Sequence, residues 1–145
     1  MKMILAFVAS ILISLAPSPA DGTSIDLYGA FFKAGHPTTG ESLESSVSDA
    51  REIENLRRTV ATLNKFPDMH FDVSGHTDHY ECQAKSCNEL AQRRAILVYR
   101  FLLDAGISGR RLTQLTKYSW TRPISGTRSD FALNQRAEVN ISQDP

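Results

Sequence analysis

Short stretches in which apolar residues take every second position predict strands, because successive side chains of a strand point to opposite faces of a sheet. Four stretches of this chain are predicted as strands, two of them with clear alternation. They are residues 25–32 (Ile25, Leu27 and Phe31 on one face), residues 69–74 (Phe71 and Val73), residues 111–118 and residues 137–141 (Ala137, Val139 and Ile141).

Two longer segments place apolar residues at helical spacing. The first begins at Ser48 or Asp49, either of which can cap a helix, and is closed by Pro67. The second follows a polar loop over residues 76–88 and ends at Gly106, a common C-terminal capping residue. Their apolar positions are Ile53, Leu56, Val60 and Leu63 in the first, and Leu90, Ala91, Leu97, Val98, Phe101 and Ala105 in the second.

The predicted order is therefore strand, helix, strand, helix, strand, strand. Residues 33–48, rich in Gly, Pro, Ser and Thr, are predicted to form a loop before the first helix. Strand–helix–strand units favour parallel neighbours, so we expect an α+β domain with two or more helices packed on a mixed four-stranded sheet.

The N-terminus has the pattern of an export signal. Lys2 precedes an apolar run from Met3 to Leu15, and small residues occupy positions 18 and 20. The run is shorter than the roughly 20 residues that span a bilayer. We predict that residues 1–20 are a cleaved signal peptide and that residues 21–145 form one domain with a flexible start at residues 21–24. No cysteine lies near that junction, which argues against a lipid anchor.

Charge and cysteine content narrow the classes of partner. The chain has 16 basic and 16 acidic residues and a net charge of +0, so nothing in its charge favours nucleic acid as a partner. A small charged ligand held by a few local groups remains possible. Cys82 and Cys87 lie close together in an exported chain, which predicts a disulfide.

Arg94 is the unusual residue of the second helix, because it lies in the middle of the apolar face. A guanidinium there needs an anion, since an unpaired buried charge costs several kcal/mol. Asp78 lies in the loop that leads into this helix and is the expected partner. Two interpretations stay open: an internal Asp78–Arg94 salt bridge, or a shared cleft in which Asp78 binds an ammonium and Arg94 a carboxylate.

The chain also resembles the OmpA-like peptidoglycan-binding domain. The resemblance covers roughly the last two-thirds of the predicted mature chain and is specific only when its motifs are taken together. These motifs are Phe-Asp-Val-Ser-Gly-His-Thr-Asp at residues 71–78, Leu-Ala-Gln-Arg-Arg-Ala at residues 90–95, Gly106 with Ile107, Tyr118, Pro123, and Asn-Gln-Arg at residues 134–136.

The resemblance implies a βαβαββ fold and non-covalent binding of peptidoglycan through the diaminopimelate of its stem peptide. Asp78 would receive the ammonium of the ligand and Arg94 its carboxylate, with Thr77 and Arg136 in supporting contacts. It also implies a periplasmic domain near the cell wall or outer membrane, with no cofactor and no enzymatic activity. Either an envelope or outer-membrane protein links this domain to a membrane, or the domain acts alone at the wall.

This chain departs from the family pattern at several positions. Cys87 stands where the family usually has an asparagine, and the loop after Asp78 is one residue longer. We hypothesise that a disulfide holds this loop in place of the asparagine. Lys-Tyr-Ser at residues 117–119 replaces Gly-Tyr-Gly, and Gln135 replaces the first arginine of Asn-Arg-Arg. Trp120 either rims the cleft or covers the edge of the core.

Two further classes of function are alternatives to wall binding: a zinc-binding domain and a protein-interaction module. His76, His79, Cys82 and Cys87 are ligand types that zinc accepts, although their spacing is irregular. A protein-interaction module of the envelope that has lost wall binding is the other alternative. It rests on the second apolar side of the second helix, at Ile96, Tyr99 and Leu103, which we expect to pack on the first helix. Hydrolase and nucleotide-binding glycine motifs are absent from the sequence.

Overall fold

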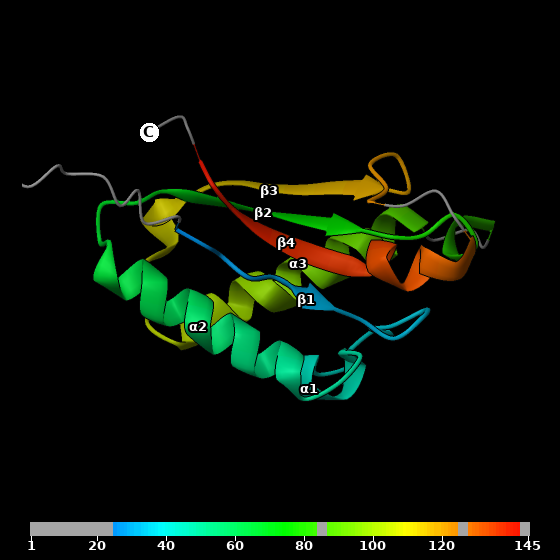
Figure 1. Ribbon diagram of the computed structural model, residues 1–145, viewed down its shortest axis with the longest axis horizontal. Coiled ribbons are helices and arrows are strands. Elements are labelled where there is room, and N and C mark those ends of the chain that lie inside the picture. The colour runs from blue at the N-terminus through cyan, green and yellow to red at the C-terminus, as the bar shows by residue number, and fades with distance from the viewer. Residues whose placement is uncertain (1–24, 84–86, 125–127, 143–145) are drawn as a thin grey trace, which may run out of the picture.

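The computed structural model describes residues 25–83, 87–124 and 128–142 (Figure 1). The predicted signal peptide and the predicted flexible start at residues 21–24 lie outside the described residues. Within the described residues, four strands and three α-helices make up the regular structure. They are β1 (Ala30–Phe31), α1 (Leu43–Ser46), α2 (Arg51–Lys65), β2 (Phe71–His76), α3 (Cys87–Asp104), β3 (Leu112–Ser119) and β4 (Arg136–Ile141).

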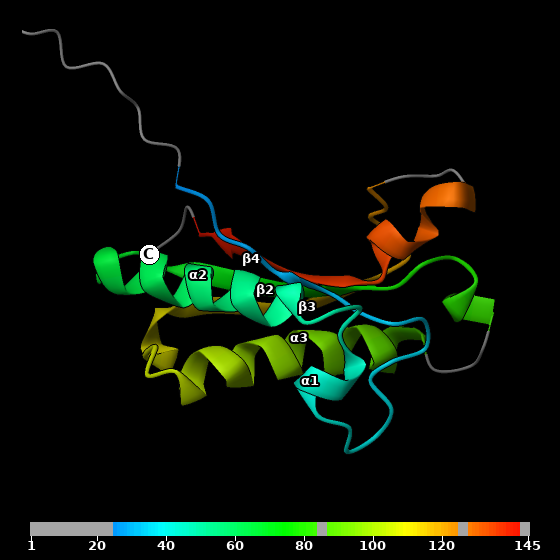
Figure 2. The same ribbon diagram turned by 60° about the horizontal axis from the view of Figure 1, so that its bottom comes forward.

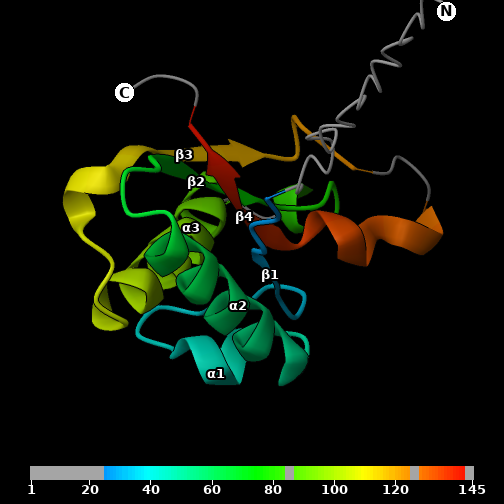
Figure 3. The same cartoon turned by 60° about the vertical axis from the view of Figure 1, so that its left-hand side comes forward.

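The four strands form one mixed sheet in the order β1-β4-β2-β3. β2 and β3 are parallel, because α3 carries the chain back between them, and β4 is antiparallel to both β1 and β2. Figure 2 shows α2 and α3 together beneath the sheet, and Figure 3 shows the same layering from another side. The predicted α+β class, with helices on a mixed four-stranded sheet, is confirmed.

The two long helices follow the predicted apolar periodicity. α2 buries Leu56 and Leu63 completely, and Ile53 and Val60 pack partly buried against the same core. The N-cap residue of α2 is Ala50, not the predicted Ser48 or Asp49, although Asp49 accepts the backbone N–H of Arg51 at 2.7 Å. α3 buries Leu90, Ala91 and Val98 of its predicted face, whereas Ala105 is exposed and the unpredicted Leu102 is buried.

α3 lies very close to β2, and a glycine makes this possible. A Cβ built on Gly75 would lie 1.7 Å from the carbonyl oxygen of Ala91, so only glycine fits between strand and helix there. α3 ends before Gly106, whose φ of 92° is the left-handed conformation predicted for a C-terminal cap. In the part of the chain that the structure describes, no helix combines the length and apolar character that crossing a membrane requires.

The N-terminal part of the domain differs from the sequence prediction. β1 has only two residues, because only Ala30 and Phe31 pair with β4 at the edge of the sheet. Phe32, not Phe31, is the buried residue, at 2% exposure. The predicted loop also contains α1, in which Ser42 accepts the N–H of Ser45 and Leu43 reaches the core. The prediction missed α1 because a single helical turn carries no periodic signal.

Candidate functional site

The candidate site lies at the carboxyl end of β2, where the chain passes through a short 3-10 helix (Glu81–Gln83) into α3 (Figure 1). Asp78 is its buried carboxylate, with 3% of its surface exposed. Its Oδ1 accepts the backbone N–H of Glu81 at 2.7 Å, and its Oδ2 accepts Nε2 of Gln135 at 2.6 Å. Two elements far apart in the sequence thus fix the orientation of this carboxylate.

Arg94 is completely buried on the sheet side of α3, at 0% exposure. Its Nε donates to the carbonyl of His36 at 2.8 Å, and its two terminal nitrogens donate to the carbonyls of His76 and Lys33 and to both oxygens of Glu81. A guanidinium has five N–H groups, and these five hydrogen bonds use all of them. Arg94 therefore ties the loop before α1, the end of β2 and the 3-10 helix to α3.

The anion that neutralises Arg94 is Glu81 and not Asp78. The two side chains form an ion pair with an N–O distance of 2.5 Å, and the ion pairs of the described residues include none between Asp78 and Arg94. Glu81 also accepts the backbone N–H groups of Asp78 at 2.9 Å and Gly35 at 2.8 Å. Of the two open interpretations, the internal Asp78–Arg94 salt bridge is therefore not found among the described residues, and Glu81 is the internal partner of Arg94.

The sequence contains the signal that would have found Glu81. Asp78 accepts from the N–H of Glu81, and Glu81 accepts from the N–H of Asp78. This reciprocal pair is a capping box, whose pattern is a short polar residue followed three positions later by Glu. In the pattern Asp-x-x-Glu at residues 78–81, the Glu81 side chain turns back across the loop, and there it forms the ion pair with Arg94.

The predicted disulfide between Cys82 and Cys87 is present. It joins the 3-10 helix to the first residue of α3, so it closes the loop at the position of the missing asparagine. Thr77, at 1% exposure, places its hydroxyl 3.0 Å from both sulfur atoms, and its backbone N–H donates to Ser119. Ser119 has a φ of 53°, so it adopts the left-handed conformation that the glycine of the family pattern would favour.

The structure does not bring Arg136 to the pockets that Asp78 lines. Its Nε donates to Glu138 at 2.6 Å, and its side chain lines a separate pocket with Phe31 and Glu52. The neighbouring residue, Gln135, makes the contact with Asp78 instead. Successive residues of an extended chain point to opposite sides, and this alternation separates the two side chains. The predicted ligand contact of Arg136 stays a prediction.

Glu138 gives the stability of this region a dependence on pH. The hydrogen bond from His76, followed by the contacts with Arg136, lowers the pKa of Glu138 from 4.5 to about 2, although burial opposes the shift. In acid the unfolded chain takes up this proton before the folded one does. The contribution of the Glu138 carboxylate to the free energy of unfolding is therefore complete above pH 4.5 and is lost as the pH falls from about 4.5 towards 2.

We expect Glu138→Gln to remove this part of the acid sensitivity. Thermal unfolding midpoints, measured for both proteins through this pH range, should converge as the pH falls. A variant whose midpoint falls as steeply as that of the wild type would contradict the assignment.

Two pockets meet at Asp78. The larger has a volume of about 480 Å³ and is lined by Ala34, Gly35, Asp78, Tyr80, Glu81, Leu90 and Arg93. The smaller, of about 230 Å³, has Trp120 and Phe131 in its wall with Asp78. Trp120 is 49% exposed and stands at right angles to the ring of His79, so it rims the cleft and does not cover the core.

The four residues proposed for zinc serve other purposes. Cys82 and Cys87 share a disulfide and so offer no thiolate. His76 is buried, with Nε2 at 3.1 Å from Ser74 and 3.5 Å from Glu138, while His79 is exposed beside Trp120. Among the described residues, no three side chains of ligand type gather as a metal site. The zinc interpretation is not supported.

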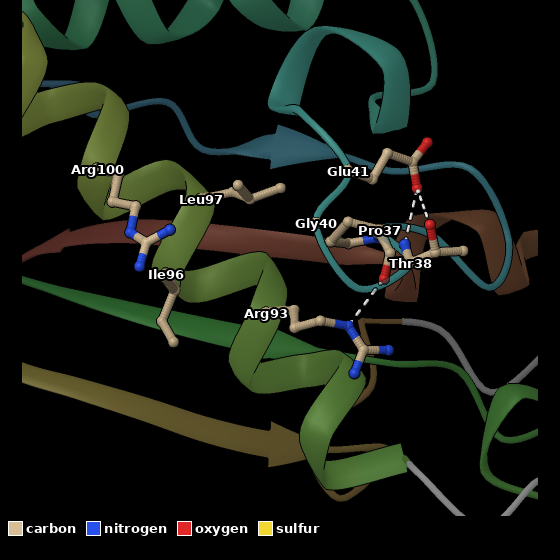
Figure 4. Close-up of a pocket in the computed structure, with 8 residues that line it drawn as sticks. All are labelled: Pro37, Thr38, Gly40, Glu41, Arg93, Ile96, Leu97 and Arg100. Atoms are coloured by element: carbon tan, nitrogen blue, oxygen red, sulfur yellow. Dashed lines mark hydrogen bonds between the residues drawn. The ribbon is translucent and has the colours of Figure 1, made fainter.

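The second apolar side of α3 is only partly covered. Tyr99 packs against the core, whereas Leu103 remains 38% exposed. Ile96 lines a shallow pocket with the loop before α1, not with α2 (Figure 4). For Ile96, the expected packing on the first long helix stays a prediction.

Comparison with known families agrees with this geometry. The sequence profile of the OmpA family matches residues 43–136, from α1 to the start of β4. This chain belongs to the OmpA family. The matched region contains Asp78, Glu81, Arg94 and the disulfide, whereas the loop that supplies Lys33, Gly35 and His36 to the site precedes it.

Solved members of the family have the same fold. The C-terminal domain of MotB from Helicobacter pylori superposes with a TM-score of 0.57 and 28% identity, covering 66% of this chain and 75% of that domain. The peptidoglycan-associated lipoprotein from Burkholderia pseudomallei superposes with a TM-score of 0.62, covering 79% of this chain and 90% of the other. At 20% identity this second likeness concerns the fold alone.

A relative with a described role is a putative outer membrane lipoprotein of a type IV secretion system in Brucella suis biovar 1 (strain 1330). It is 27% identical over 106 residues, covering 66% of this chain. The chain spans 59% of that lipoprotein, less than two thirds of its length.

Proposed function

We propose that this OmpA-family domain binds peptidoglycan without cleaving it, through the diaminopimelate residue of the stem peptide. The observation that carries the proposal is Asp78, a carboxylate fixed by two donors at the junction of two pockets. A carboxylate held in this way can receive the ammonium group of a ligand without first reorganising. Membership of the OmpA family and a relative named as a putative outer membrane lipoprotein agree with a place in the cell envelope.

Thr77 and Arg94 support this site through the chain around Asp78. The N–H of Thr77 donates to Ser119 of β3, and its hydroxyl contacts the disulfide, so the residue before Asp78 is fixed from two sides. Arg94 holds Glu81, whose backbone N–H in turn holds Asp78. Because Arg94 has no donor left, we propose that it positions the loop while the Glu81 pair is intact.

The same proposal assigns the domain to the periplasm, where the peptidoglycan wall lies. A domain that holds the wall from there needs a link to a membrane if it is to act as a tether. We propose that an envelope or outer-membrane protein supplies this link.

Co-sedimentation with purified diaminopimelate-type sacculi tests the function. We expect wild-type protein in the pellet and Asp78→Asn in the supernatant, with an affinity lower by about tenfold or more, because the amide keeps the shape but cannot pair with an ammonium. Asp104→Asn is the matched control, since Asp104 is exposed at the end of α3, and it should sediment like the wild type.

Two results would contradict the proposal. Wild-type protein that stays in the supernatant would favour a protein-interaction module that has lost wall binding. Equal sedimentation of wild type and Asp78→Asn would mean that the wall is bound at another place.

A further inference from the structure

Binding of diaminopimelate at Asp78 leaves the carboxylate of the ligand without an obvious partner. This step rests on the function proposed above. The five N–H groups of Arg94 all have acceptors within the chain, and two of these acceptors are the oxygens of Glu81. A second, available cation is therefore needed on the wall of the same pocket.

Arg93 is that cation. It precedes Arg94 on α3 and lines the pocket of about 480 Å³ together with Asp78 and Tyr80. Its Nε donates to the carbonyl of Pro37 at 2.9 Å, which Figure 4 shows as a dashed line from the side chain to the loop. Within the described part of the chain, no hydrogen bond or ion pair engages the two terminal nitrogens of Arg93.

We propose that Arg93, and not Arg94, receives the carboxylate of the zwitterionic ligand, while Asp78 receives its ammonium. The bond from Nε to Pro37 restrains the side chain, so less conformational entropy is lost when a ligand binds. The two terminal N–H₂ groups that remain can donate in parallel to one carboxylate, the geometry that arginine favours. The pocket thus offers one free anion and one free cation to a ligand that carries one of each.

Displacement of Glu81 by the ligand is the less favourable route to Arg94. The carboxylate of Glu81 is 5% exposed and accepts from Arg94 and from the N–H groups of Asp78 and Gly35. A ligand carboxylate that displaced Glu81 would have to replace all of these hydrogen bonds. Glu81 would also compete with it at the high effective concentration of a group in the same chain. Arg93 can bind without breaking any of these contacts.

Calorimetric titration tests the assignment, with a soluble stem peptide in which alanine follows diaminopimelate, so that this residue carries one free ammonium and one free carboxylate. The matched pair is Arg93→Ala and Arg100→Ala, because both arginines lie on α3 and line the pocket of Figure 4, but only Arg93 also lines the pocket of Asp78. We expect Arg93→Ala to bind about tenfold or more weakly, and Arg100→Ala to bind like the wild type. Amidation of the ligand carboxylate should weaken binding to the wild type and leave Arg93→Ala unaffected.

Three outcomes separate the alternatives. If Arg93→Ala binds as the wild type does, and Glu81→Gln binds more tightly, the ligand uses Arg94 and the inference is overturned while the proposed function survives. If the wild type binds neither the peptide nor sacculi, both fail. Arg93→Gln replaces Arg93→Ala should the alanine variant not fold, with the same result expected.

Discussion

Arg94→Ala should lose about 3–5 kcal/mol of folding free energy, the range measured when one member of a buried ion pair is removed. The substitution leaves the nearly buried Glu81 carboxylate without its cation, and it removes the hydrogen bonds that Arg94 donates to the carbonyls of His36 and His76. A small domain has a total stability of about 5–15 kcal/mol, so most of the protein could unfold at moderate temperature. Urea unfolding followed by circular dichroism measures the loss.

Arg100→Ala is the control, since Arg100 is an exposed arginine on the same helix and its removal should change stability by less than about 0.5 kcal/mol. Glu81→Ala and the double variant complete a double-mutant cycle. If Arg94 and Glu81 stabilise each other, the double variant loses less than the sum of the two single losses. A loss below about 1 kcal/mol in Arg94→Ala would contradict the pairing.

This expected loss changes how the site can be tested. Loss of wall binding in Arg94→Ala would not identify a ligand contact, because unfolding produces the same result. Asp78→Asn and Arg93→Ala are the informative variants. Asp78→Asn keeps the size and shape of the side chain, and the side chain of Arg93 makes a single hydrogen bond within the described residues.

The periodicity of apolar residues was enough to predict the long helices and strands of the fold. Leu56 and Leu63 identified the buried face of α2, and Val73 that of β2, because each lies in a pattern that repeats over several residues. The sequence also placed Arg94 in the middle of the apolar face of its helix, and the structure buries this side chain completely. Parallel pairing of β2 with β3 followed from the helix between them.

What the sequence left open depends on single contacts between distant residues. Glu81 was not predicted as the partner of Arg94: the local pattern Asp-x-x-Glu signals a capping box, but the contact of its Glu with Arg94 forms only in the folded domain. Gln135, for which the sequence predicted no contact, donates to Asp78, whereas Arg136 donates to Glu138, because a single register position decides which of the two faces Asp78. Register of that kind is fixed by tertiary pairing, and the pattern of residues does not determine it.

Gly75→Ala should be the other substitution with a large effect, although it adds only one methyl group. The new Cβ would lie 1.7 Å from the carbonyl oxygen of Ala91 and 3.2 Å from the backbone nitrogen of Ala95. These are backbone atoms, so no side chain can rotate away and α3 itself has to move from β2. We expect a loss of at least about 3 kcal/mol, at the upper end of what overpacking costs.

Gly106→Ala separates this steric effect from the general cost of replacing a glycine. Gly106 has a positive φ but open space around it, so its substitution should cost only about 1 kcal/mol, from backbone strain alone. Because α3 carries Arg93 and Arg94, the shift of this helix expected in Gly75→Ala would also move the pocket wall away from Asp78 and weaken ligand binding. Equal losses in the two variants would mean that β2 and α3 do not approach as closely as the structure has them.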